Sequence, residues 1–407
     1  MKMSLLCAAI AKLHLSPRRF FRSADGPARR GVCWEGDART RLSAVHLVAA
    51  WPRCVFCHFV ALVLGAHALQ AADGAKSVPY RPSFIIGADI SAVPAAEARG
   101  VKWSDGGTNK DLLQILKDHG FNYIRLRIFV EPTNAGGYSR QGYCGMAQTM
   151  AMGKRVKDAG MGFLLDFHYS DTWADPGKQT KPLAWRELPL DQLVQTVHDY
   201  TKDVVTQLKN NGAEPDMVQI GNEITPGMLL NTVPGGRGGG GPRQISTQPE
   251  GSARNWDSLA SLLQAGIAGA KEADPRILVV LHIDKGGDNA ASRGWVDAAL
   301  AHGVSFDILG ESCYTRYQGP PDSWRTNFND LAERYPRLSF IVAEVGFETT
   351  EANAIMHDLP DHRGLGTFIW EPTQGMNQQQ LFDGTGAVIP EKMALYDKVV
   401  KDYRVQP

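Results

Sequence analysis

The chain has 407 residues, which is enough for one large barrel-type domain or for two domains of average size. Its hydrophobic content of 43% and charged content of 21% are ordinary for a soluble globular protein. The formal net charge is zero, but residues 1–71 carry ten Lys and Arg against three Asp and Glu, whereas the rest of the chain carries 33 against 40. A mildly acidic body gives no reason to expect the basic face that nucleic-acid binding usually needs, so we expect no nucleic-acid partner.

The first segment, residues 1–75, has the pattern of a leader rather than of a folded domain. It is Arg-rich and irregular as far as Arg53, after which a short apolar run extends to Leu64 and small residues follow. A basic flank, a short apolar core and a small-residue exit are typical of a secretory signal peptide. We therefore predict a cleaved signal around residues 45–72 and a secreted or periplasmic protein without a membrane partner. The alternative is an uncleaved membrane anchor, for which the run is short.

Cysteine usage divides along the same boundary. Four of the six cysteines lie in the leader, and only Cys144 and Cys313 remain in the body. In an exported chain these two could form one disulfide, but they lie in distant segments. One disulfide and two buried free thiols both remain open.

From residue 84 onward, short apolar runs alternate with longer segments in which apolar residues recur every three or four positions, as at Leu193, Val197, Val204 and Leu208. The expected strands are Phe84–Ile90, Tyr123–Phe129, Gly162–Phe167, Met217–Gly221, Ile277–Ile283, Phe306–Gly310, Ser339–Ala343 and Gly366–Trp370. Strand–helix alternation predicts a parallel sheet of the α/β class. Eight such units predict a single (β/α)₈ (TIM) barrel over residues 76–407.

A doubly wound open sheet is the alternative fold. It would favour a Gly-rich phosphate-binding turn after the first strand, whereas this chain has Gly87-Ala88-Asp89 without that fingerprint. Polar or aromatic residues instead stand at almost every expected strand end: Asp89, Arg125, Arg127, His168, Glu223, His282, Tyr314, Glu344, Trp370 and Glu371. A barrel collects all its strand ends around one mouth, which favours the barrel.

Residues 232–255 interrupt the alternation. They contain the Gly-rich run 235–241 and almost no apolar side chains. No Gly-Lys-Ser/Thr sequence closes the run, so it is not a phosphate-binding loop. We interpret it as a disordered insertion, with a mobile flap beside the site as the alternative.

Two carboxylates stand at strand ends in a suggestive pattern. Met217–Gly221 leads directly to Asn222 and Glu223, and Ser339–Ala343 leads to Glu344. Two carboxyl groups, one as proton donor and one as nucleophile, are the minimal equipment for cleaving a glycosidic bond. The pattern therefore predicts a glycosidase.

Several further motifs follow the order of one known family: Gly87–Ser91, Tyr123–Arg127, Asp166–Pro176, Lys181–Trp185, Gln219–Thr225 and Trp370–Pro372. On these motifs the chain resembles glycoside hydrolase family 53, the arabinogalactan endo-β-1,4-galactanases, over roughly residues 82–403. The run Asp166–Pro176 is the most specific. The resemblance implies a barrel, a retaining mechanism and β-1,4-galactan as the polysaccharide substrate.

The resemblance also assigns Glu223 as acid/base and Glu344 as nucleophile. To donate a proton, Glu223 needs a raised pKa, and a second carboxylate at close range would raise it. Asn222 is expected to bind the sugar 2-OH. Arg125 is expected beside Glu344, with a structural ion pair as the alternative, and Tyr314 is expected to donate its hydroxyl to Glu344 unless it is a core aromatic.

Aromatic and polar residues complete the expected substrate site. Trp173, Trp185 and Trp370 are interpreted as stacking platforms for sugar rings, and the resemblance places Trp370 as the floor under the cleaved sugar. Trp173 lies on a long loop and could instead fasten that loop to the barrel. Asp89 and His168 are expected to bind sugar hydroxyls, whereas for His282 a structural role is favoured.

We expect no metal and no cofactor, because no His, Asp or Glu group has metal-ligand spacing and the mechanism needs none. A structural calcium is implied only by some family members.

The sequence departs from the family pattern at 311–315 and 345–347 and in the longer Gly-rich loop, which leaves endo or exo action open. Alternatives are a mannanase, an arabinanase-type enzyme, an exo-galactosidase or a non-catalytic carbohydrate-binding barrel. We expect a monomer.

Overall fold

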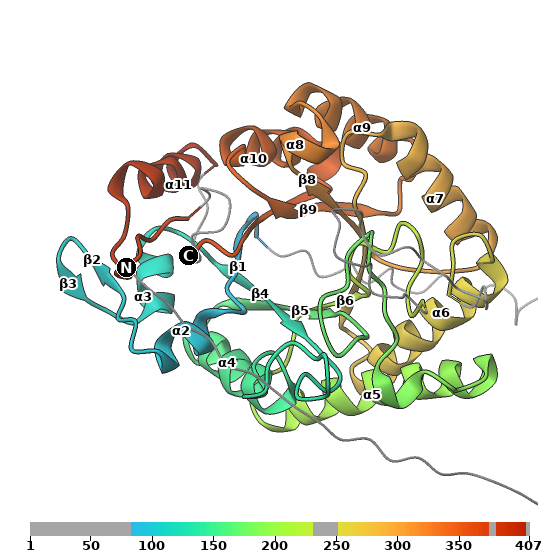
Figure 1. Cartoon of the computed structure of the whole chain (residues 1–407). Coiled ribbons are helices and arrows are strands. Elements are labelled where there is room, and N and C mark those ends of the chain that lie inside the picture. The colour runs from blue at the N-terminus through green and yellow to red at the C-terminus, as the bar shows by residue number, and fades with distance from the viewer. Residues whose placement is uncertain (1–82, 231–250, 374–379, 404–407) are drawn as a thin grey trace, which may run out of the picture. The chain divides into compact units, whose positions relative to one another are not determined.

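The computed structural model describes residues 83–230, 251–373 and 380–403 (Figure 1). The predicted leader 1–75, its signal at 45–72 and residues 232–250 of the Gly-rich insertion lie outside the described residues. Their interpretation stays a prediction.

Eight parallel strands close into a barrel in the order β1-β10-β9-β8-β7-β6-β5-β4, with β4 returning to β1 (Figure 1). The strands are β1 (Ile85–Asp89), β4 (Tyr123–Ile128), β5 (Gly162–Phe167), β6 (Met217–Ile220), β7 (Leu278–Ile283), β8 (Ile308–Cys313), β9 (Ser339–Val345) and β10 (Gly364–Trp370). A short antiparallel pair, β2 (Ser104–Asp105) and β3 (Thr108–Asn109), lies outside the barrel. The predicted (β/α)₈ barrel is confirmed, and the open-sheet alternative is wrong.

Helices surround the barrel on its outer side, except the short helix α8, which follows the carboxyl end of β8 (Figure 1). They are α2 (Val93–Ala98), α3 (Leu112–Asp118), α4 (Met146–Asp158), α5 (Leu190–Asn210), α6 (Trp256–Ala273), α7 (Asn289–Ala301), α8 (Thr315–Gln318), α9 (Pro321–Arg334), α10 (Thr349–Asp358) and α11 (Pro390–Tyr403), with short 3₁₀ turns at Leu183–Trp185 and Pro360–His362. The last helix closes the ring beside the first units, because Tyr396 packs on Phe121 with ring centroids 4.5 Å apart. Within the described residues, none of these helices is both long enough and apolar enough to span a bilayer.

Local sequence explains where these helices form. Helix α5 buries Leu193, Val197 and Leu208, which recur at helical spacing on one face. Helix α3 begins after Asp111, whose carboxylate accepts a hydrogen bond from the Leu113 backbone N–H at 2.8 Å. Such caps satisfy backbone groups that the first helical turn leaves without partners.

The interior of the barrel has an apolar tier and a polar tier. The apolar tier includes Ile85, Tyr123, Leu164, Met217, Val280, Ile308, Ile341 and Phe368. Two or four residues further along most strands, the same face carries Asp89, Arg125, Asp166, Gln219, His282 and Ser312, all buried. Because side chains alternate across a strand, the period of two places both tiers inside the barrel. The polar tier lies at the carboxyl ends of the strands.

Strand β9 carries an irregularity that affects the site. On β8, Glu311 and Ser312 are consecutive, but on β9 their partners are Val342 and Glu344, so one extra residue is inserted there. A β-bulge of this kind redirects the side chains that follow it. The bulge lies directly before Glu344, which belongs to the strand rather than to the loop after it.

Two sequence predictions are decided by the packing. Cys144 and Cys313 are both buried and free, so the disulfide alternative is wrong and the two thiols are confirmed. Burial raises the pKa of the Cys144 thiol to about 11, against the effect of nearby Arg127. Burial likewise raises the pKa of Cys313. Neither thiol is activated as a nucleophile.

Glu311 is a fully buried carboxyl on the outer face of β8. Its Oε2 accepts a hydrogen bond from Asn327 of α9 at 2.6 Å, and its Oε1 has no hydrogen-bond partner. Burial raises its pKa to about 8, while hydrogen bonds from Ser292 and Asn327 oppose the shift. The folded state therefore holds a proton at neutral pH that the unfolded chain has released.

This proton makes stability depend on pH. Stability that protonated Glu311 contributes is fully present below the unfolded pKa, about 4.5, and is lost as pH rises to about 8. We expect Glu311→Gln to reduce the fall in the free energy of unfolding between pH 5 and 8 by about 1.4 kcal/mol per pH unit, the value for one proton. Urea unfolding at several pH values measures this. An unchanged slope would show that Glu311 is ionised in the folded protein.

Candidate active site

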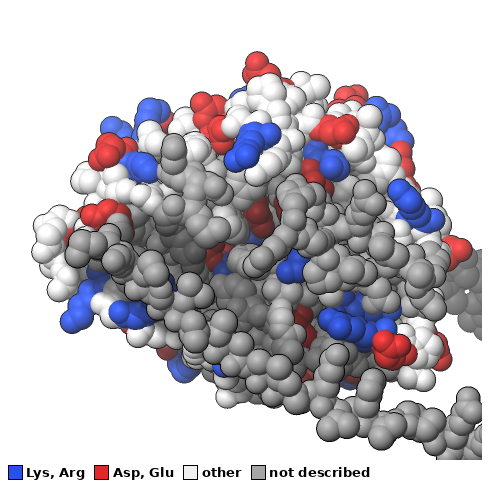
Figure 2. Space-filling view, in the orientation of Figure 1, with Lys and Arg blue, Asp and Glu red and all other residues white. Residues whose placement is uncertain are grey.

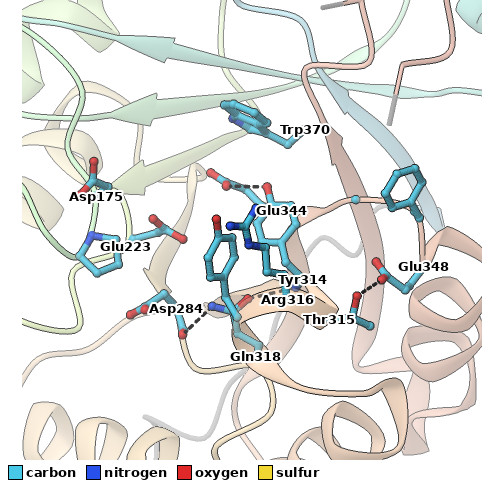
Figure 3. A pocket seen from close by; sticks show the side chains of 14 residues that line it. Asp175, Glu223, Asp284, Tyr314, Thr315, Arg316, Gln318, Glu344, Glu348 and Trp370 are labelled. Atoms are coloured by element: carbon cyan, nitrogen blue, oxygen red, sulfur yellow. Dashed lines mark hydrogen bonds between the residues drawn. The ribbon is translucent and has the colours of Figure 1, made fainter. Parts of the chain in front are cut away.

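A cavity of about 830 Å³ opens at the carboxyl ends of the strands. Its lining comes from six successive strand ends and their loops: Asp175, Pro176, Glu223, Asp284, Tyr314, Thr315, Arg316, Tyr317, Gln318, Glu344, Gly346, Phe347, Glu348 and Trp370. Figure 3 shows Glu223 and Glu344 on facing sides of this cavity, with Trp370 beside Glu344. Barrel enzymes carry their active sites at this end.

A tight turn after β6 delivers Glu223. Gly221 has φ +85°, and a Cβ there would lie 2.5 Å from the Ile224 side chain, so only glycine fits. Glu223 itself has φ +48°, which a residue other than glycine rarely adopts. The Ile224 N–H donates to the His282 carbonyl at 2.9 Å and fixes the turn to β7. Backbone strain held in this way is common at functional sites.

The surroundings of Glu223 favour its protonated form. Burial raises the pKa of Glu223 well above its ordinary value, and the charge of Glu344 raises it further. A hydrogen bond from Ser312 Oγ to Glu223 Oε1, at 2.7 Å, acts in the opposite direction. The sequence attributed the raised pKa to the second carboxylate; the structure adds burial as the larger cause.

Glu344 has partners suited to a carboxylate. Arg125 Nη1 donates to its Oε1 at 3.0 Å, and the Tyr314 hydroxyl donates to its Oε2 at 3.0 Å (Figure 3 draws the Tyr314 bond). Burial raises the pKa of Glu344, but the Arg125 charge and the Tyr314 hydrogen bond oppose the shift. Among the described residues no Lys or Arg forms an ion pair with Glu223, and the pKa of Glu223 is raised further than that of Glu344, so Glu344 gives up its proton first.

Arg125 connects most of the polar tier. Besides Glu344, its guanidinium donates to Asp89 at 3.0 Å, Asp166 at 2.9 Å, Asn222 at 2.8 Å and Gln219 at 3.2 Å. All these groups are buried. A guanidinium has five N–H donors, so this arrangement uses its full capacity. Arg125 thus orients Glu344 and Asn222 together.

We expect Arg125→Met to lower the free energy of unfolding by about 3–5 kcal/mol, because it leaves buried carboxylates without their cation. Lys154→Met is the matched control, since Lys154 pairs with Asp158 on the surface, at side-chain exposures of 55% and 62%. That variant should lose less than about 1 kcal/mol. Urea unfolding of both variants measures the difference; equal losses would contradict the interpretation.

Asn222 and His282 lie beside Arg125 in the polar tier. Asn222 Nδ2 donates to the Ala174 carbonyl at 2.9 Å, and its Oδ1 faces His282 Nδ1 at 2.9 Å. His282 is fully buried, and burial followed by the Arg125 charge lowers its pKa well below the ordinary value. His282 is therefore a neutral internal partner, in line with the structural role favoured from the sequence.

Two residues expected at the substrate lie beneath the cavity wall. Asp89 accepts hydrogen bonds from Ser91 at 2.7 Å and from Arg125. His168 Nε2 lies 3.0 Å from Asp166, and its Nδ1 accepts from the Ala174 N–H at 2.9 Å. Neither residue is part of the cavity lining, so both support groups nearer the cavity.

The three tryptophans have different positions. Trp370 lines the cavity. Trp173 packs behind it, with ring centroids 6.1 Å apart, and the guanidinium of Arg127 lies 4.1 Å from the Trp173 ring centroid. Trp185 is only 7% exposed and packs edge-on against Tyr200. The interpretation of Trp185 as a stacking platform is therefore wrong, because its ring fills the space between a loop and helix α5.

Several lining residues were not expected from the sequence: Asp175, Asp284, Arg316, Tyr317 and Glu348. Asp175 lies inside the most specific family motif, and Asp284 follows the strand end at Ile283, so their positions offered a signal. Tyr317 is 70% exposed and lies in helix α8, and Phe347 is 53% exposed and lies in the loop after β9. Nothing in the local pattern of Tyr317 distinguished it from an ordinary surface residue, whereas Phe347 lies in the stretch 345–347 where the sequence departs from the family pattern.

Within the three described ranges, no group of three or more His, Cys, Asp or Glu side chains is arranged to hold a metal ion. The expectation of no cofactor stays a prediction.

In the view of Figure 2, Lys and Arg alternate with Asp and Glu over the visible described surface. The expectation of no nucleic-acid partner likewise stays a prediction.

Comparison with known proteins places the chain in a family. Residues 85–357 match the sequence model of Glycosyl hydrolase family 53. Arabinogalactan endo-beta-1,4-galactanase A of Emericella nidulans is 32% identical over 320 residues, which are 70% of this chain and 84% of that protein. An uncharacterized protein of Niallia circulans, from the bgaB 5′ region, is 45% identical over 62% of this chain, which spans 65% of that relative.

Solved structures agree. The catalytic domain of family 53 from Ignisphaera aggregans superposes with a TM-score of 0.70 at 30% identity, covering 79% of this chain and 98% of that one. The resemblance read from the motifs is confirmed: the chain belongs to glycosyl hydrolase family 53.

Proposed function

We propose that this protein is a secreted endo-β-1,4-galactanase that hydrolyses galactan, or type I arabinogalactan, with retention of configuration. The observation that carries the proposal is the presence of Glu223 and Glu344 in one cavity, with surroundings that separate their pKa values. Such a pair divides into an acid and a nucleophile. The galactanase activity named for the Emericella nidulans relative supports the choice of substrate.

The reaction would run in two displacements. The Glu344 carboxylate attacks the anomeric carbon while the bond to the leaving oxygen breaks and Glu223 gives that oxygen its proton. In the second step Glu223, now a carboxylate, takes a proton from water, and the resulting hydroxide displaces Glu344. Arg125 and Tyr314 stabilise Glu344 when it is released as a carboxylate. In this mechanism side chains of the protein act as nucleophile and as acid/base, so the proposed enzyme uses no cofactor. Both carboxyl groups come from a single barrel, so we propose that it works as a monomer.

Binding of a polymer is supported by the cavity rim. Trp370 offers an apolar ring at the cleaved sugar, and the exposed rings of Tyr317 and Phe347 offer surfaces on which further sugars can stack. A chain held at several points is cut internally, which favours endo action over an exo-galactosidase. The half-buried Asp175, which lines the same cavity as Glu223, supplies a hydrogen-bonding group for the sugar.

Product analysis tests the proposal. Debranched galactan, mannan and arabinan are each incubated with the purified protein, and the masses of the separated products are determined by mass spectrometry. We expect galactooligosaccharides of several lengths from galactan and none from the other polymers. Galactose alone would indicate exo action, and oligosaccharides from mannan only would identify a mannanase. No product from any polymer would favour the non-catalytic carbohydrate-binding barrel.

A further inference from the structure

Ser312 of β8 connects Glu223 to the interior of the barrel. Its side chain is fully buried, and its Oγ lies 2.7 Å from Glu223 Oε1 and 2.9 Å from His282 Nε2. A serine hydroxyl carries a single hydrogen, so it can donate to only one of these two atoms at a time. The other contact must receive its hydrogen from the partner.

The state of His282 follows from its other nitrogen. Nδ1 lies 2.9 Å from Asn222 Oδ1 and 3.2 Å from Gln219 Nε2. One hydrogen of the Gln219 amide is used by Asp166 at 2.6 Å, and the second has a closer acceptor, the Gly221 carbonyl at 3.1 Å. The shortest contact of Nδ1 is therefore with an acceptor, so Nδ1 carries the imidazole hydrogen and Nε2 carries none.

The amide orientation of Asn222 supports this assignment. Its Oδ1 accepts from Arg125 at 2.8 Å, and its Nδ2 donates to the Ala174 carbonyl at 2.9 Å. A guanidinium only donates, so the atom facing both Arg125 and His282 must be the oxygen. The neutral imidazole agrees with the lowered pKa of His282.

The chain Asn222–His282–Ser312–Glu223 thus has three contacts, and each requires one hydrogen. Neutral His282 and Ser312 supply two. The third can come only from Glu223, so every contact is satisfied when Glu223 is protonated. When Glu223 is ionised, Ser312 turns to donate to it, and His282 Nε2 loses its hydrogen-bond donor.

We propose that Ser312 and His282 are positioning residues that retain the proton of Glu223 until it is delivered to the leaving group. This inference rests on the proposed function, in which Glu223 is the acid/base. While Glu223 is protonated, Ser312 donates to His282 Nε2 and accepts from the carboxyl. After the proton passes to the leaving oxygen, the Ser312 hydroxyl rotates and donates to the carboxylate. No covalent bond of Ser312 or His282 breaks in this exchange.

Replacing His282 and replacing Ser312 should shift the pKa of Glu223 in opposite directions. In His282→Leu the Ser312 hydroxyl has no competing acceptor and donates permanently to Glu223, which stabilises the carboxylate. In Ser312→Ala the Glu223 carboxylate loses the hydrogen bond that Ser312 donates to it, which favours the protonated form of Glu223. Asn222 Oδ1 keeps Arg125 in both variants, so neither leaves it without a partner. A purely structural role of either residue would not produce shifts of opposite sign.

Neighbouring charges remain constant in this comparison. The groups acting on Glu223 are Glu344, Asp284 and Asp175, and those acting on His282 are Arg125, Asp166 and His168. Both variants keep all six. A difference between the variants therefore reports the hydrogen-bonded chain rather than the charges around it.

The experiment is the pH dependence of kcat/KM for galactan hydrolysis, whose basic limb reports the acid of the free enzyme. We expect the limb to move to lower pH in His282→Leu and to higher pH in Ser312→Ala, each by about one pH unit, the scale of one hydrogen bond to a charged group. Thr201→Val is the control, because it removes a buried hydroxyl of α5 that contacts Tyr169, and the basic limb of this variant should match that of the wild type. Shifts of the same sign, or uniformly lower rates with an unmoved limb, overturn the proposal.

A second readout does not depend on activity or on the variants folding. In protein labelled with ¹⁵N histidine, we expect the His282 signals of a neutral ring with hydrogen on Nδ1 and none on Nε2 at pH values below the basic limb. Hydrogen on Nε2 under those conditions overturns the proposal. A wild-type protein that does not hydrolyse galactan would refute the proposed function. The histidine measurement would still test the hydrogen-bond arrangement of Asn222, His282, Ser312 and Glu223.

Discussion

Replacing Glu344 by alanine is expected to lower kcat on galactan by roughly 10³-fold or more, the scale expected when a nucleophile that acts as part of a unit is removed. Without Glu344 no covalent intermediate forms, and Arg125 and Tyr314 lose the carboxylate they orient. Reducing-sugar release at saturating galactan measures the change. Binding of galactan should persist, since the aromatic rim is intact.

Glu348→Ala is the matched control for this variant. Glu348 lies four residues further along, lines the same cavity and accepts a hydrogen bond from Thr315, but it contacts neither Arg125 nor Tyr314 among the described contacts. We expect its kcat to stay within about tenfold of the wild type, since it removes a carboxylate outside the reacting pair. Comparable losses in both variants would mean that the cavity needs negative charge in general, and Glu344 would lose its assignment.

Glu223→Ala is expected to show an effect that depends on the leaving group. For galactan, whose leaving oxygen needs a proton, kcat/KM should fall by about 10²–10⁴-fold, the usual contribution of a general acid. For an aryl galactooligosaccharide with an acidic phenol as leaving group, kcat/KM should change far less, because the phenolate leaves without protonation. Kinetics on both substrates measure the two losses.

Adding azide to the Glu223→Ala variant tests the role of Glu223 as the base of the second step. It is a nucleophile that needs no general base, so it should accelerate the second step in Glu223→Ala and release a β-galactosyl azide. Equal losses on both substrates, with no effect of azide, would remove Glu223 from the role of acid/base.

The barrel itself was largely readable from the sequence. Six of the eight expected strands begin within one residue of the observed ones, because fully buried parallel strands form short apolar runs bounded by helical patterns. Strand β8 was placed too early: it begins at Ile308 and continues through Glu311 to Cys313. A buried glutamate inside a strand has no sequence signal, since its position depends on Asn327 from α9.

The site was readable where chemistry stands at a strand end. Glu223, Glu344, Tyr314 and Trp370 all line one cavity, as the convergence of barrel strand ends predicts. Trp185 shows the limit of this reasoning, because an aromatic residue in a family motif can serve packing alone.

The supporting groups needed the three-dimensional arrangement. Gln219 occupies an inward position of β6, and its alternation with Val218 and Ile220 could have indicated a polar group inside the barrel. Ser312 could not have been found, because its role depends on the orientation of His282 and on a contact with Glu223, which lies 89 residues away in the chain. The bulge in β9 was equally hidden, since it appears only in the pairing of that strand with β8.

One measurement tests the central assignment most directly. A 2-fluoro galactoside with a good leaving group slows the second displacement, so the covalent intermediate accumulates and can be located by mass spectrometry of the digested protein. The account predicts one added fluorosugar per chain, carried by the peptide that contains Glu344. A label on another residue, or an active protein that never becomes labelled, would contradict a mechanism in which Glu344 is the nucleophile.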